Sequence, residues 1–104
     1  MHIDHAKVRR ESLRWLILLT LNNARPCGAQ ESPILSVAQS IYPDASPLEL
    51  RRELDYLGDR DLVELRKDPS GPWHAELTRY GVDIAEYTID CEPGIARPQK
   101  YWAG

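Results

Sequence analysis

The sequence predicts an α+β fold in which three helices are followed by a two-stranded hairpin and a fourth helix. Three observations support this prediction. Apolar residues recur at helical spacing in three segments before residue 60. A capping motif marks the start of the third segment at Ser46. Between residues 62 and 77 the apolar residues instead alternate with polar ones, which is the spacing of half-buried strands.

The chain of 104 residues is long enough for one domain with one core. We expect a single domain over residues 1–104, with an N-terminal helical extension at 1–10 and an extended tail at 91–104. The longest apolar run, residues 15–19, is far shorter than the roughly 20 residues of a membrane span. The N-terminus lacks the features of a secretory signal. We therefore expect a cytoplasmic protein without membrane contact, in which Cys27 and Cys91 are thiols.

The first helix is expected to run from near Asp4 to about Asn22. An apolar stripe along it has the i, i+3, i+4, i+7, i+8 spacing and comprises Leu13, Leu16, Ile17, Thr20 and Leu21. Further apolar residues lie on roughly the opposite side: Val8, Trp15, Leu18 and Leu19. A helix that is apolar on two sides must be covered on both.

The second helix is expected to begin at Ser32 and Pro33, which suit the N-cap and the first helical position, and to end near Tyr42. Its apolar positions are Ile34, Val37, Ala38 and Ile41. The third helix begins after Ser46 with Pro47 at its first position and Glu49 completing a capping box, so that Leu50, Leu54 and Leu57 face inward. The connection of three or four residues between these helices, around residues 43–45, has helix-turn-helix spacing.

The alternating segments near residues 63–66 and 73–77 predict the two strands, and the sequence Asp-Pro-Ser-Gly-Pro at 68–72 predicts the turn between them. Thr78 can cap a last helix that reaches about Ile89. Residues 91–98 are too rich in proline and glycine to be helical. Three helices, a hairpin and a helix in this order predict a winged helix-turn-helix fold.

Three segments carry a resemblance to known proteins. "DYLGDRDLVEL" and "ELTRYG" resemble the winged-helix regulators of the multiple-antibiotic-resistance and PadR types. "LTRYGVDIAEYTIDCEPGIARP" is similar to small winged-helix proteins encoded in Mu-like bacteriophages and prophages, and the resemblance extends from about Glu11 to Pro98. It implies a phage-derived bacterial protein with a winged-helix fold, of the kind called transcriptional-regulator-like.

The second apolar side of the first helix has two explanations. The last helix or the tail can cover it within one chain, or a second copy of the chain can cover it across a two-fold axis. We expect the homodimer, because winged-helix regulators commonly dimerise through terminal helices and aromatic anchors suit interfaces. The candidate dimer interface comprises Val8, Trp15, Leu18, Leu19, Tyr101 and Trp102.

The net charge is −3, and the positive charge is concentrated at the two ends of the chain: residues 1–30 carry +3 and residues 97–104 carry +2. The third helix nevertheless suits the major groove, where Arg52 can pair with guanine and Leu48 can contact a thymine methyl group. The hairpin and the first helix offer further basic groups for phosphates. The candidate DNA contacts are Ser46, Leu48, Arg51, Arg52, Tyr56, Arg66, Lys67, His74, Arg9, Arg10 and Arg14.

An opposing interpretation is equally open for the third helix. Arg51 and Arg52 can pair with Glu49 and Asp55 along a solvated helix, and Asp55 and Asp59 on the same face would repel phosphate. The hairpin tip can likewise be simply solvated, because Glu64 and Asp68 dilute its positive charge. The alternative function is then a protein-protein interaction module on a winged-helix scaffold that binds no DNA.

No arrangement typical of an enzyme is present. There is no phosphate-binding glycine loop, catalytic triad order or pair of catalytic carboxylates. His2 and His5 are too few for a metal site, and Cys27 lacks an evident histidine partner. We therefore expect no enzyme, cofactor or metal. The sequence predicts a dimeric winged-helix protein that binds double-stranded DNA in transcription control or phage DNA handling, with a phage or host protein as a further possible partner.

Overall fold

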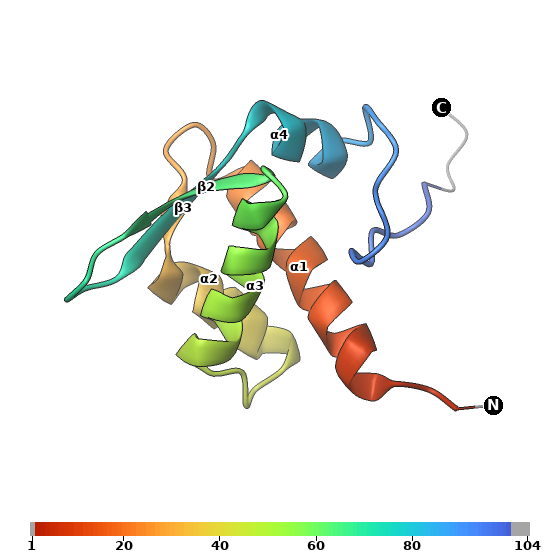
Figure 1. Cartoon of the computed structure of the whole chain (residues 1–104), viewed down its shortest axis with the longest axis horizontal. Coiled ribbons are helices and arrows are strands. Elements are labelled where there is room, and N and C mark those ends of the chain that lie inside the picture. The colour runs from red at the N-terminus through yellow and green to blue at the C-terminus, as the bar shows by residue number, and fades with distance from the viewer. Residues whose placement is uncertain (1, 101–104) are drawn as a thin grey trace.

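The computed structural model describes residues 2–100 and shows the predicted α+β fold (Figure 1). In chain order the elements are α1 (His5–Asn23), β1 (Ala29–Gln30), α2 (Glu31–Ile41), α3 (Pro47–Asp59), β2 (Val63–Lys67), β3 (Trp73–Leu77) and α4 (Arg79–Ala85). α2 and α3 form the helix-turn-helix, and β2 and β3 form the hairpin, called the wing below. The winged helix-turn-helix architecture is therefore confirmed.

Side-chain caps begin three of the helices where the sequence predicts them. Asp4 accepts a hydrogen bond from the backbone N–H of Lys7, Ser46 from that of Glu49, and Thr78 from that of Gly81. The capping box at α3 is only half formed, because the Glu49 carboxylate binds Arg9 instead of the helix start.

Two predicted boundaries are wrong. α2 begins at Glu31, with Gln30 as an N-cap that makes no side-chain bond, so Ser32 and Pro33 lie inside its first turn. α4 ends at Ala85 rather than near Ile89. There the chain turns away through Tyr87, whose φ of 62° lies in the left-handed region that interrupts a helix.

A short strand that the sequence did not predict completes the sheet. β1 pairs antiparallel with β3, with Ala29 opposite Ala75, and the strand order is β1-β3-β2. The loop before it crosses β3 closely: Gly28 has a φ of 72°, and a Cβ atom there would overlap the carbonyl oxygen of Ala75. Glycine is thus required for this approach both by backbone conformation and by space.

α1 lies at the centre of the core, with α2 and α3 on one side and α4 on another (Figure 1). Leu13, Ile17 and Leu21 are buried, as the first stripe predicts. On α2, Ile34 and Ala38 are buried but Ile41 is 57% exposed, so the predicted apolar period holds only for the first two turns. None of the helices within residues 2–100 is long and apolar enough to cross a membrane.

The second apolar side of α1 is covered within the chain. Leu18 is fully buried, and Trp15 is 9% exposed and packs edge-on against Tyr87, with ring centroids 5.8 Å apart. The prediction that Trp15 and Leu18 form a dimer interface is therefore wrong, because α4 and the following residues cover them. Leu19 is half-buried against the same core, and Val8 is 52% exposed. Tyr101 and Trp102 lie outside the described residues.

Residues 91–98 form a C-terminal strap that lies along α1, seen in blue in Figure 1. The backbone N–H of Ala96 donates to the carbonyl oxygen of Glu11, and Arg14 donates to that of Gly94. Arg97 donates to the carbonyl oxygen of Ile84, near the end of α4, and to that of Ile89 in the segment after the helix. The strap is therefore tied to both helices by polar contacts as well as by packing.

We expect Trp15→Ala to lower the free energy of unfolding by about 3–5 kcal/mol, because it leaves a cavity between α1 and Tyr87. Val8→Ala is the matched control on the same helix and should change stability by less than about 0.5 kcal/mol. Chemical denaturation measures both. A stable Trp15→Ala variant whose only change is in oligomeric state would restore the dimer interpretation.

Candidate nucleic-acid interface

The first half of α3 and the turn end of the wing are joined by one cluster of three residues, Glu31, Arg51 and Trp73. The Glu31 carboxylate accepts a hydrogen bond from Arg51 Nε at 2.7 Å and another from the backbone N–H of Trp73 at 3.0 Å. The Arg51 guanidinium lies 4.8 Å above the Trp73 ring. Because Glu31 belongs to the first turn of α2, this cluster fixes α2, α3 and the wing relative to one another.

The hydrogen bonds of this cluster keep both of its charged groups ionised. The bond from Arg51 holds the pKa of Glu31 below its ordinary value, and the bond from the Trp73 N–H lowers it further against the opposing effect of burial. The same ion pair raises the pKa of Arg51. Arg51 was a predicted DNA contact. In the structure its guanidinium is bound by Glu31 and helps to hold α3 in position.

A second ion pair joins α3 to the wing. Lys67 Nζ lies 2.6 Å from Asp55 Oδ1 and 4.7 Å from the centroid of the Trp73 ring. Lys67, another predicted DNA contact, therefore already has a carboxylate partner. The pair also neutralises Asp55, one of the two acidic residues that the sequence sets against phosphate on this helix.

α1 contributes two more ion pairs to α3. Arg9 forms two hydrogen bonds of 2.7 Å with the Glu49 carboxylate and one of 2.9 Å with Asp44, and these raise its pKa. Arg14 Nε lies 2.7 Å from Glu53 Oε1, with the two side chains only 11% and 5% exposed. Arg9 and Arg14 are therefore structural residues here, and not the free basic group that the sequence suggested.

Tyr56, another predicted DNA contact, packs against two arginine side chains. Its ring lies between two guanidinium groups, 3.5 Å from Arg14 and 3.9 Å from Arg60, measured from each Cζ to the ring centroid. A Cβ atom on Gly94 would overlap its hydroxyl oxygen, so the strap passes directly over it. Tyr56 is therefore half-buried between α1 and the strap.

Four ion pairs thus converge on α3, through Glu49, Arg51, Glu53 and Asp55. The sequence held a signal for one of them: Glu53 lies within the inward stripe of Leu50, Leu54 and Leu57, where a lone carboxylate requires a partner. The predicted pairing of Arg51 and Arg52 with acids along α3 itself is wrong. Arg51 pairs with Glu31 of α2, and Arg52 has no acidic partner among residues 2–100.

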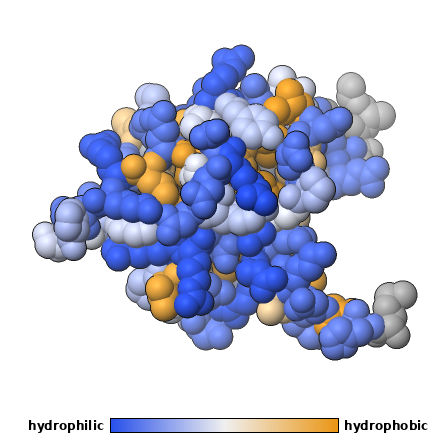
Figure 2. Space-filling view, viewed as in Figure 1, coloured by the Kyte–Doolittle hydropathy of each residue, from blue (hydrophilic) through white to orange (hydrophobic). Residues whose placement is uncertain are grey.

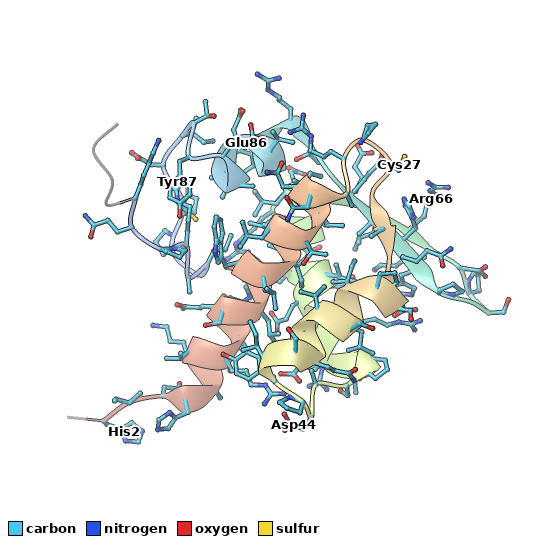
Figure 3. All side chains as sticks on the ribbon, turned by 180° about the vertical axis from the view of Figure 1, so that it is seen from behind. His2, Cys27, Asp44, Arg66, Glu86 and Tyr87 are labelled. Carbon is cyan, nitrogen blue, oxygen red and sulfur yellow. The ribbon has the colours of Figure 1, made fainter. Side chains whose placement is uncertain are left out.

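The cations without an acidic partner among residues 2–100 include Lys7 and Arg10 on α1, Arg52 on α3 and Arg66 on β2, and all four are exposed. Arg66 extends from the wing into solvent (Figure 3). It lies on the outer face of the sheet beside His74, whose buried Nε2 has no hydrogen-bond partner in the structure. These cations belong to three separate elements.

The first turns of α3 remain open to solvent. Ser46, Leu48 and Arg52 are exposed, and Leu48 is 60% exposed. Figure 2 shows this side of the molecule as mainly hydrophilic, with separate hydrophobic spots rather than one apolar patch. Of the predicted DNA contacts, the structure therefore leaves Ser46, Leu48, Arg52, Arg66 and Arg10 available.

We expect Glu31→Gln to destabilise the fold at neutral pH and to have less effect in acid. A carboxylate with a lowered folded-state pKa contributes stability above its unfolded-state pKa, and loses that contribution as the pH falls through the folded-state value. The difference in unfolding free energy between wild type and variant should therefore shrink below the ordinary glutamate range. A difference that is constant with pH would contradict the ion pair.

Arg14→Ala should lower the free energy of unfolding by about 3–5 kcal/mol, because it leaves the buried Glu53 carboxylate without its partner. Arg10→Ala, on the same helix but exposed, should lie within about 0.5 kcal/mol of wild type. Urea denaturation of the two variants gives the comparison. Equal, small effects would mean that Arg14 is not a structural residue.

Comparisons with known proteins bear on the fold. No protein-family model matches the chain, and no curated protein matches it. Among solved structures, it is similar to one from Ralstonia eutropha JMP134 described as a "putative DNA-binding protein", with 24% sequence identity and a TM-score of 0.60. The match covers 86% of this chain and 100% of the other. At this identity, the likeness shows that the two proteins share a fold.

Proposed function

We propose that the chain binds double-stranded DNA through the exposed first turns of α3, with the wing beside them. One observation carries the proposal: Ser46, Leu48 and Arg52 are open to solvent at the start of a helix that is otherwise held by ion pairs on its remaining sides. A recognition helix needs such a fixed position, because base contacts depend on register. The described function of the Ralstonia structure agrees with this proposal.

Each exposed residue has a definite role in this proposal. Arg52 has no acidic partner, so its guanidinium is free to donate two hydrogen bonds to a guanine edge. Leu48, one turn earlier on the same face, contacts a thymine methyl group. The Ser46 hydroxyl accepts the capping bond and can still donate its own hydrogen to a phosphate. Arg66 supplies a phosphate contact from the wing.

The internal ion pairs set the strength of binding. Four basic residues that the sequence offers to phosphates are held by carboxylates: Arg9, Arg14, Arg51 and Lys67. Phosphate contacts provide most non-specific affinity, so few free cations mean weak binding. The binding that remains should fall as salt rises, because its contacts are mostly from arginines to phosphates.

The biological role that we propose is transcription control or phage DNA handling. This part of the proposal rests on the resemblance to proteins of Mu-like phages.

The same ion pairs favour an alternative function, a protein-protein interaction module without DNA binding. They neutralise most of the positive charge near α3 and leave the exposed apolar side chains of Leu48 and Ile41 on the helix-turn-helix. In that case the first turns of α3 would contact a phage or host protein. Failure to bind DNA is what separates this alternative from the main proposal.

The test is fluorescence anisotropy with a pool of labelled mixed-sequence duplexes at low salt, followed by a salt titration. We expect weak binding that falls as salt rises. Arg52→Ala should reduce discrimination between sequences by about 1–3 kcal/mol, whereas Arg66→Ala should weaken all sequences alike and lower the salt slope by about 1.

Arg79→Ala is the matched control, because Arg79 is exposed on α4, at the far end of the molecule from the start of α3 (Figure 1). It should leave binding unchanged. Absence of binding at high micromolar protein would reject the proposal in favour of the interaction module. Equal losses from all three variants would mean that binding is general and does not use α3.

A further inference from the structure

A cavity of about 510 Å³ lies between the end of α3, the start of α4 and the strap. Its floor is formed by Leu62 and Ile84, which are 2% and 1% exposed. Tyr80, Pro93 and Ile95 form its walls. Its volume lies within the range of small-molecule sites, which are typically concave and apolar with a few polar groups.

Two charged residues line the same cavity without neutralising each other. Arg60 stacks on Tyr56, with its Cζ 3.9 Å from the ring centroid, but has no carboxylate partner among residues 2–100. The Glu92 carboxylate likewise has no cationic partner within that range. The Tyr80 hydroxyl makes no hydrogen bond to any described residue. Arg60 and Glu92 are both exposed at the mouth of the cavity, so their charged groups are open to a ligand.

We propose that this cavity binds a small molecule that has an apolar body and a single carboxylate. The apolar floor and walls would bury the body, and the planar guanidinium of Arg60 matches a carboxylate with two parallel hydrogen bonds. Arg60 follows directly after α3 and is stacked on Tyr56, so it is already held in place before a ligand arrives. Tyr80 offers a hydroxyl donor to the same ligand.

Glu92 restricts the ligand further. Its negative charge on the strap disfavours a second acidic group or a phosphate, which carries more negative charge than a carboxylate. It would accept a hydrogen bond from a neutral donor on the ligand. The ligand class is therefore an aromatic or branched monocarboxylic acid. This proposal uses residues outside the proposed DNA surface and does not depend on DNA binding.

The test uses the whole chain, labelled with ¹⁵N, and probes that differ only in charge. Phenylacetate and indole-3-acetate are the acids, their primary amides are neutral controls, and phenethylamine and tryptamine are the matching cations. The acids should shift the amide resonances of Leu62, Ile84 and Ile95 while leaving that of Ser36, on α2, unchanged. We expect the amides and amines to bind at least about tenfold more weakly than the acids, because they lack a charge that pairs with Arg60.

Arg60→Gln should reduce the affinity for the acids to that for the amides, and Arg60→Lys should retain part of the preference for the acid. Arg10→Gln, an exposed arginine on α1, is the control and should bind as wild type does. The proposal is overturned if no acid shifts the cavity resonances, if the three charge types bind equally, or if Arg60→Gln keeps the preference. Circular dichroism confirms that each variant is folded before titration.

Discussion

The ion pair between Arg14 and Glu53 is the interaction on which the rest of this structure depends. Burying two charges is costly, and the cost is offset only when every remaining hydrogen-bonding group finds a partner. Here Arg14 also donates to the carbonyl oxygen of Gly94 and stacks on Tyr56, so one guanidinium joins α1, α3 and the strap. Apolar packing alone tolerates small rotations of a helix, whereas these directional contacts define one position of α3 against α1.

Charge in this protein therefore serves mainly to place α3. Glu49, Arg51, Glu53 and Asp55 follow one another at every second position, and each pairs with a residue of another element. Two of their partners come from α1, one from α2 and one from the wing. The helix is held from several directions, and its first turns remain exposed to solvent. The small number of free cations follows from the same arrangement, because basic side chains used for support are not available to a ligand.

The parts of the fold that local chemistry determines could be predicted from the sequence. Caps at Asp4, Ser46 and Thr78, and the alternation in the wing, act over a few residues and leave a readable pattern. β1 was missed because two residues are too few to show a period, and the end of α4 depends on the conformation of Tyr87. The site was predicted less well, because each partner of a basic residue lies far away in sequence: Arg9 pairs with Glu49, and Arg51 with Glu31. Pairing of this kind becomes visible only once the helices are packed.

The strap has a consequence for how the chain is made. It completes the cover over α1, a helix that is synthesised long before it. Until residues 84–97 have left the ribosome, the side of α1 that carries Trp15 and Leu18 has no partner and remains an exposed apolar surface on a nascent chain. Chaperones recognise such surfaces, and chains that stop early would keep them. Loss of the strap would thus leave an aggregation-prone fragment, which makes residues 91–98 a sensitive place for truncation.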